Sequence, residues 1–216
     1  MTKLALVTGA TSGIGYAYAE QLAADGYDLV AVGRNQDRLR ELAETLSAVT
    51  VTTVAADLSS DLGIRTVAEL CASEPLDLLV NNAGVAHYMP LAELSVSQAS
   101  ELVHVKVLAP TMLARAAVPG MLQRQAGTIV NVAGMLGFGG PAPLAPMRGR
   151  AIYTATLAHL IAFTGHARGA LAQRPHPSGL LPRCRRHRVS HPPGHRHERC
   201  SSNVGARRRH RQPPRP

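Results

Sequence analysis

Two kinds of apolar segment alternate along the first three quarters of the chain. Short, mostly apolar runs bounded by turn residues predict buried strands. They occupy residues 4–7, 28–33, 49–55, 76–80 and 128–132. Longer segments between them carry apolar residues on one helical face, as over residues 14–25, where Gly26 marks the end of the helix. Strands that alternate with helices predict an α/β domain with a parallel sheet.

A glycine-rich turn joins the first predicted strand to the first predicted helix. The stretch TGATSGIG runs from Thr8 to Gly15 and holds three glycines. Glycines at these positions let the backbone approach a pyrophosphate, and the helix that begins here directs its free N–H groups at the negative charges. The candidate dinucleotide-binding residues of this turn are Thr8, Gly9, Thr11, Ser12, Gly13, Ile14 and Gly15.

The spacing of these glycines resembles the TGxxxGIG signature of the short-chain dehydrogenase/reductase family. Asp57, followed by Leu58, ends the third strand, where the family uses an aspartate to hydrogen-bond the adenine amino group; a helix cap is the alternative role. The motif NNAG after the fourth strand supplies Asn82, Ala83 and Gly84, which match residues beneath the cofactor in that family. The resemblance implies a Rossmann-like, doubly wound sheet and hydride transfer between a nicotinamide and a carbonyl or alcohol.

The end of the second strand bears on the choice of cofactor. An acidic residue there binds the ribose hydroxyls of NAD(H), whereas a cation binds the 2′-phosphate of NADP(H). The chain has Arg34 between Gly33 and Asn35, with no carboxylate beside it in the sequence. A planar guanidinium suits a phosphate, so NADP(H) is predicted in preference to NAD(H). A solvated arginine at the start of a helix is the alternative.

The resemblance implies four catalytic residues, of which this chain keeps one. Family members use a tyrosine as acid/base, a lysine four residues later, a serine upstream and an asparagine on the preceding long helix. Tyr153 matches the tyrosine, whose ordinary pKa near 10 calls for a neighbouring cation. Leu157 stands at the lysine position, Gly134 at the serine position and Lys106 at the asparagine position.

Several residues are candidates for the missing roles. Lys106 is the first candidate for the cation that lowers the pKa of Tyr153. The alternative is a lysine that extends from an amphipathic helix to solvent. Arg148 and Arg150 are further candidates for this cation. For Tyr153 itself, the alternative to catalysis is a structural role in the core. Three residues after NNAG either border a substrate pocket or fill a loop: His87, Tyr88 and Met89.

Charge divides the chain into two parts near Gly165. Residues 1–164 carry 10 Lys plus Arg and 13 Asp plus Glu, a net charge of −3. Residues 165–216 carry 13 Arg, no Lys and one acid, Glu198, a net charge of +12. This segment is rich in proline and histidine and has few apolar residues to offset the entropy of ordering, so it is predicted to be a disordered tail.

Three other interpretations of this tail remain open. Its charge suits nucleic acid, and six residues suit zinc: Cys184, His187, His191, His195, His197 and Cys200. Neither function is favoured, because interleaved aromatics and a recognised ligand spacing are both lacking. The third interpretation is that the tail is the translation of GC-rich DNA in the wrong reading frame. One codon assignment for residues 180–190, shifted by a base, encodes a Pro-Gly segment similar to the one after the family's sixth strand.

These observations predict an NADP(H)-binding domain over residues 1–164 and a tail over residues 165–216. The domain would hold five of the family's seven strands and lack the last two. Three cysteines without a disulfide framework, and a start without a signal peptide, indicate the cytoplasm. No membrane span and no metal site are predicted. The expected partner is a small carbonyl or alcohol, and a homo-oligomer stays open. The alternatives are a nucleotide-binding protein without activity and nucleic-acid binding through the tail.

Overall fold

The computed structural model describes residues 2–138 and 150–172. Residues 1–175 fall within one compact unit. Arg148, the candidate zinc ligands and the segment considered for a frame change lie outside the described residues. The proposed domain boundary at residue 164 therefore stays a prediction.

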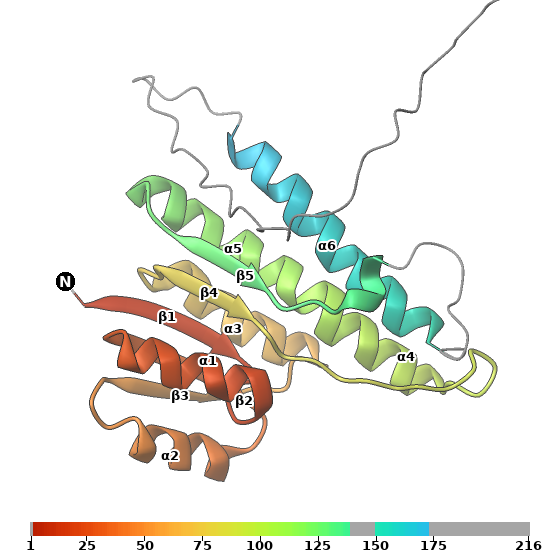
Figure 1. Ribbon diagram of the computed structural model, residues 1–216, viewed down its shortest axis with the longest axis horizontal. Helices are drawn as coiled ribbons and strands as arrows, with labels where there is room; N and C mark the ends of the chain where they lie inside the picture. Colours follow the sequence, from red (N-terminus) through yellow and green to blue (C-terminus); the bar gives the residue numbers. More distant parts are fainter. Residues whose placement is uncertain (1, 139–149, 173–216) are drawn as a thin grey trace, which may run out of the picture. The chain divides into compact units, whose positions relative to one another are not determined.

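The described strands form one parallel sheet in the order β3-β2-β1-β4-β5 (Figure 1). The strands are β1 (Lys3–Thr8), β2 (Tyr27–Gly33), β3 (Val51–Ala55), β4 (Leu78–Asn81) and β5 (Thr128–Asn131). Their bounds agree with the predicted ones within two residues, and the predicted Rossmann-like class is confirmed. The strand order reverses between β1 and β4, and the carboxyl ends of strands at such a switch point are where doubly wound sheets bind ligands.

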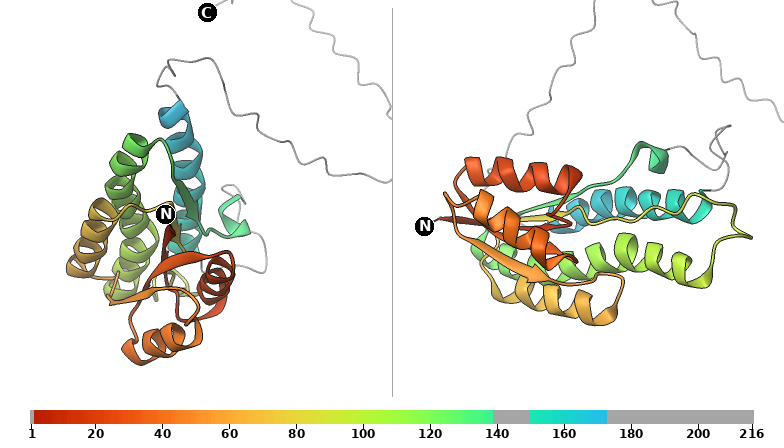
Figure 2. Two further views of the ribbon diagram at one scale, coloured as in Figure 1. Left: turned by 90° about the vertical axis from the view of Figure 1, so that its left-hand side faces the viewer. Right: turned by 90° about the horizontal axis from the view of Figure 1, so that it is seen from below.

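Helices connect the strands and cover the two faces of the sheet. They are α1 (Gly13–Ala24), α2 (Gln36–Thr45), α3 (Asp61–Ser73), α4 (Val96–Val103), α5 (Ala109–Arg124) and α6 (Ala151–Ala172), with a π-helical turn η1 (His104–Leu108) and a 3₁₀ turn η2 (Met135–Phe138). Figure 2 shows the sheet between α1 on one side and α3 with α5 on the other. Helix α6 continues past Gly165, where the composition changes.

Successive residues of the central strands point into two separate cores, as the pleat of a strand requires. In β1, Ala5 and Val7 join the core under α1 and α2, whereas Leu6 joins the core under α3 and α5. Leucines buried almost completely, such as Leu29 and Leu113, each contribute about 1.5–3 kcal/mol relative to an exposed position. Both faces of these central strands are buried, which explains why they form continuous apolar runs in the sequence.

Elements α4, η1 and α5 form one helical run over Val96–Arg124. By length and composition alone this run is able to cross a membrane, which differs from the expectation that no segment is long enough. About 44% of the most apolar 18-residue stretch of this run is buried inside the fold, where α5 packs against α3. Its apolar character therefore matches that of a core helix of this domain.

A chain of side-chain hydrogen bonds ties α6 to the sheet. Asn81 Nδ2 of β4 donates to Asn131 Oδ1 of β5 at 2.9 Å, and Asn131 Nδ2 donates to Thr164 Oγ1 of α6 at 2.9 Å. Farther along, Thr111 of α5 lies 3.2 Å from His159 Nε2 of α6. These contacts fix the helix that carries Tyr153 against β5 and α5, and through Asn131 and Asn81 link it to β4.

Candidate functional site

The glycine-rich turn and the NNAG segment are joined by hydrogen bonds into one unit. Thr8 Oγ1 accepts from the backbone N–H groups of Asn82 and Ala83, each at 3.0 Å, and donates to the Val80 carbonyl at 3.3 Å. Asn82 Nδ2 donates to the carbonyl oxygens of Thr8 and Gly9 at 3.0 and 3.3 Å. Thr8 is only 1% exposed, so its side chain holds the two motifs together.

Two glycines of the turn stand where a side chain would collide. A Cβ on Gly9 would lie 3.0 Å from Ala83 Cα, and Gly9 also adopts a φ of +67°. A Cβ on Gly15 would overlap the Gly9 carbonyl oxygen and the Asn82 amide. Gly13 differs, since its φ is +54° but the space around it is open. The close approach of the turn to the NNAG segment therefore depends on Gly9 and Gly15.

The amino end of α1 lies directly after this turn. Ser12 occupies the N-cap position, yet its side chain makes no capping hydrogen bond to the helix. The first turn of α1 also contains no acidic residue. Free N–H groups at a helix start favour an anion. This geometry, together with the cradle that a Cβ would fill, fits the pyrophosphate of a dinucleotide.

Asp57 is positioned by the turn between β3 and α3. Its Oδ1 accepts from the backbone N–H of Ser59 at 2.9 Å and from the Ser59 hydroxyl at 2.8 Å. The backbone hydrogen bond is the main cause that holds the pKa of Asp57 below its usual value, and the Arg34 guanidinium adds to the effect. Ser60, rather than Asp57, caps α3. Asp57 is therefore an exposed, ionised acceptor beside the buried Leu58.

Arg34 reaches a carboxylate that is distant in the sequence. Its Nη1 lies 3.4 Å from Oε1 of Glu101 on α4, and the other Glu101 oxygen lies 2.8 Å from Nε2 of His87. The Arg34 side chain is 63% exposed and that of Glu101 is 25% exposed. The sequence contained no signal for this contact, because the arginine and the acid are 67 positions apart.

Lys106 lies in the π-helical turn η1, where Ala109 N–H donates to the carbonyl of His104 five residues earlier. Pro110 has no N–H to offer to the Lys106 carbonyl, which explains why the regular helix is interrupted here. Lys106 as a whole is 8% exposed, and burial lowers its pKa. Its Nζ lies close to Gly84 and 5.3 Å from the centroid of the Tyr153 ring.

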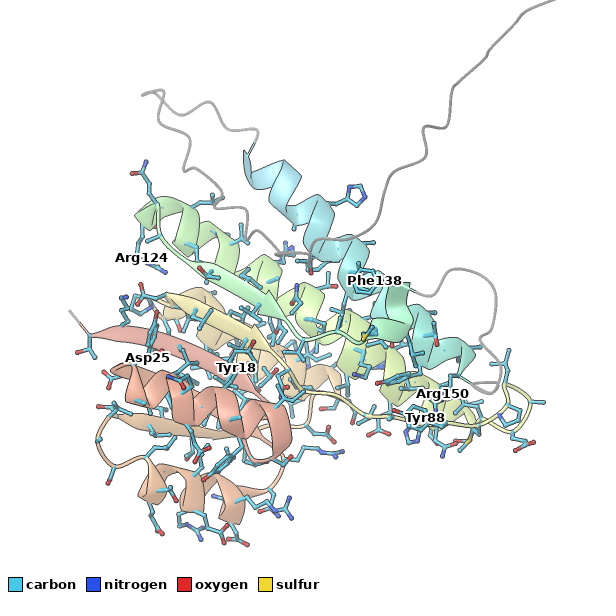
Figure 3. All side chains as sticks on the ribbon, viewed as in Figure 1. Tyr18, Asp25, Tyr88, Arg124, Phe138 and Arg150 are labelled. Carbon is cyan, nitrogen blue, oxygen red and sulfur yellow. The ribbon has the colours of Figure 1, made fainter. Side chains whose placement is uncertain are left out.

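Tyr153 lies in the first turn of α6 and contacts a second tyrosine. The rings of Tyr153 and Tyr88 meet edge to face with centroids 5.1 Å apart, and the Arg150 guanidinium lies 4.2 Å from the Tyr88 ring centroid. Figure 3 shows Tyr88 and Arg150 together beside the start of α6. Burial, and then a hydrogen bond with Tyr88, raise the pKa of Tyr153, while Arg150 acts in the opposite direction. The cluster thus favours the protonated tyrosine.

The positions aligned with the family's serine and lysine pack against each other. Leu157 is 2% exposed, and a Cβ on Gly134 would lie 3.0 Å from Leu157 Cδ1. Leucine therefore fills part of the space that a side chain at position 134 would need. The structure brings Lys106 and Tyr153 together, whereas it gives the serine and lysine positions an apolar contact.

Two residues of this region were missed or left undecided by sequence reasoning. Tyr88 was a candidate pocket residue, and only the fold shows that it contacts Tyr153. Glu101 had no predicted role, although its helical segment precedes Lys106. A carboxylate one and a half turns before the asparagine position is the only signal that would have drawn attention to it.

Comparisons with known proteins identify the family to which this fold belongs. A family model described as short chain dehydrogenase matches residues 3–175. An uncharacterized oxidoreductase of Bacillus subtilis is 37% identical over 141 residues, covering 63% of this chain and 58% of that protein. The bulky-bulky ketone specific alcohol dehydrogenase from Comamonas testosteroni superposes with a TM-score of 0.73 at 33% identity, covering 79% of this chain and 68% of that one.

A second solved structure, the short-chain dehydrogenase from Sphingobium yanoikuyae in complex with NADPH, has a TM-score of 0.73 at 34% identity and covers 79% of this chain and 66% of that one. The match thus spans between 58% and 68% of the lengths of these three proteins. The family model matches most of the chain, and the strand order of the parallel sheet and the glycine-rich turn agree with that match. The chain therefore belongs to the short chain dehydrogenase family of oxidoreductases.

Proposed function

We propose that this chain binds NADP(H) and reduces a carbonyl compound, with Tyr153 as the proton donor. The observation that carries the proposal is the placement of the Lys106 ammonium, which lies beside Gly84 of the NNAG segment and 5.3 Å from the centroid of the Tyr153 ring. Bound NADPH would supply the hydride. The remaining chemistry belongs to the chain, which must orient the carbonyl and provide one proton to its oxygen.

Arg34 supports the choice of NADP(H). It follows β2 at the sheet edge where the adenosine ribose lies in this fold class, and more than half of its side chain is exposed. A guanidinium binds a phosphate through two parallel hydrogen bonds. The relative from Sphingobium yanoikuyae was solved in complex with NADPH, which supports the same preference.

The raised pKa of Tyr153 supports reduction rather than oxidation. Reduction needs a protonated tyrosine that donates to the developing alkoxide, whereas oxidation needs the phenolate as base. A hydrogen bond from the Tyr153 hydroxyl to Tyr88, together with burial, favours the protonated form. Tyr153 is therefore ready to act as an acid over the whole neutral range of pH.

Lys106 is proposed to take over the work of the lysine that Leu157 replaces. Its buried ammonium lies between Gly84 and the Tyr153 ring, so it is able to stabilise the phenolate left after proton donation. Leu157 cannot fill this role, because its side chain is apolar and is packed in the core against Gly134.

A deuterium-transfer experiment tests the proposed function. The full chain is incubated with NADPH deuterated at the nicotinamide C4 and a panel of ketones, and deuterium on the product carbinol carbon is measured by mass spectrometry. We expect transfer that persists through neutral pH and falls only above about 10, where Tyr153 loses its proton. Tight binding of NADPH without any transfer would contradict the proposal.

Replacing the partner of Tyr153 has a predicted effect on its titration. In Tyr88→Phe the ring contact stays but the hydroxyl is lost, so we expect the pKa of Tyr153 to fall toward its ordinary value. The measurement is an NMR titration of the protein labelled with carbon-13 at the tyrosine ζ position. Tyr27→Phe, a change at the start of β2, serves as the control. An unchanged Tyr153 titration in Tyr88→Phe would refute the assigned hydrogen bond.

A further inference from the structure

A carboxylate that is absent from the sequence neighbourhood of Arg34 reaches it in the folded chain. Glu101 Oε1 lies 3.4 Å from Arg34 Nη1, and Glu101 Oε2 lies 2.8 Å from His87 Nε2. Arg34 follows the end of β2, Glu101 lies on α4, and His87 lies in the segment that connects β4 to α4. Strands β2 and β4 flank β1 on either side, so this contact spans the carboxyl end of β1.

The two ends of the contact differ in how firmly they are held. Glu101 is mostly buried and has a second partner in His87, whose side chain is 22% exposed. Arg34 is largely exposed and also acts on the Asp57 carboxylate. Water and salt weaken an ion pair with an exposed member. Arg34 is therefore the partner that can change position, while Glu101 stays at the site.

We propose that Glu101 determines cofactor specificity, because it competes with the 2′-phosphate of NADP(H) for Arg34 and so limits discrimination against NAD(H). The inference rests on the proposed function, since Arg34 must be the residue that receives the phosphate. A 2′-phosphate that replaces Glu101 on Arg34 also brings its own negative charge near the carboxylate. In NAD(H) the corresponding group is a neutral hydroxyl, which meets no such repulsion and can donate a hydrogen bond to a carboxylate.

His87 has a positioning role in this scheme. Its contact with Glu101 Oε2 leaves Oε1 directed at Arg34. Asp57 is the other acid near the guanidinium, and its Oδ1 is occupied by two hydrogen bonds from Ser59. Glu101 is accordingly the carboxylate in direct ion-pair contact with Arg34 within the part of the chain that the structure describes.

Binding of two nucleotides separates the effect of the phosphate from that of the rest of the cofactor. The full chain is titrated calorimetrically with 2′,5′-ADP and with 5′-AMP, which differ only in the 2′-phosphate. We expect Glu101→Gln to bind 2′,5′-ADP about fivefold more tightly than the unaltered chain and 5′-AMP no more tightly. In an Arg34→Ala background the same substitution should give no gain. Glu93→Gln removes an exposed acid from the segment that precedes α4 and is the matched control.

The outcomes distinguish this inference from the function on which it rests. Equal changes for the two nucleotides in Glu101→Gln, or a gain that persists without Arg34, would overturn the role of Glu101 alone. If Arg34→Ala binds 2′,5′-ADP as well as the unaltered chain does, the assignment of Arg34 to the 2′-phosphate is wrong. Absence of binding by either nucleotide would overturn the proposed cofactor site and this inference together.

Discussion

Tyr153→Phe is expected to lower the rate of carbonyl reduction by about 10²–10⁴-fold, the usual contribution of a positioned general acid. The substitution removes one oxygen and keeps the ring that contacts Tyr88 and Lys106. The apolar packing of α6 should therefore survive, and the affinity for NADPH should change little. The measurement is single-turnover oxidation of bound NADPH, followed by its fluorescence, in the presence of a ketone that the unaltered chain reduces.

Lys106→Met provides the comparison for this result. Methionine keeps an unbranched apolar stem in the buried site but removes the ammonium beside the Tyr153 ring. If Lys106 stabilises the phenolate, this variant should also be slower, and its alkaline limit should move to higher pH because the phenolate has lost a cation. A Tyr153→Phe variant that retains the full rate would show that the proton comes from another group.

Gly15→Ala is expected to abolish measurable cofactor binding and to destabilise the domain. A Cβ at this position would overlap the Gly9 carbonyl oxygen and the Asn82 amide, and it would lie 2.8 Å from the Gly9 carbonyl carbon. Relief of this overlap requires the glycine-rich turn and the NNAG segment to separate. Overpacking of this kind costs about 1–3 kcal/mol. For a domain of this size, each kcal/mol lowers the melting temperature by about 2–4 °C.

Gly13→Ala separates crowding from backbone strain. Gly13 has a φ of +54° but no atom within 4 Å of the place that a Cβ would take. The substitution should cost about 1–2 kcal/mol through the left-handed backbone alone and leave the contact between the two motifs intact. Thermal unfolding and titration with 2′,5′-ADP measure both variants. A Gly15→Ala chain that binds as tightly as Gly13→Ala would contradict the importance of the close approach.

The candidate cofactor-binding residues could be found from the sequence because they lie next to strands. The turn after β1, Asp57 after β3 and the NNAG segment after β4 each follow an apolar run directly. In a parallel sheet the carboxyl ends of neighbouring strands lie at one edge, so short local motifs meet there without any knowledge of side-chain packing. The positions of the central strands β1, β2 and β4 could be predicted because both of their faces are buried and their apolar runs are continuous.

The reacting half was less accessible to sequence reasoning, because its contacts join segments far apart in the chain. Lys106 was a candidate cation from its alignment, but its burial next to Gly84 and Tyr153 depends on how η1 packs against the NNAG segment and α6. The sequence predicts that a neighbouring cation lowers the pKa of Tyr153, but the effects that raise this pKa are larger in the structure. Burial and Tyr88 raise that pKa, and neither is visible in a pattern of residue types.

By itself, the sequence determined the α/β class, the five strands and the presence of a glycine-rich turn between the first strand and the first helix, because each depends on hydrophobic periodicity or on glycines at short spacing. Tertiary structure alone decided which charged groups meet. Arg34, without a carboxylate beside it in the sequence, pairs with Glu101, and Tyr153 pairs with Tyr88. Electrostatic interactions depend on distance and burial in three dimensions, and separation along the chain carries almost no information about either.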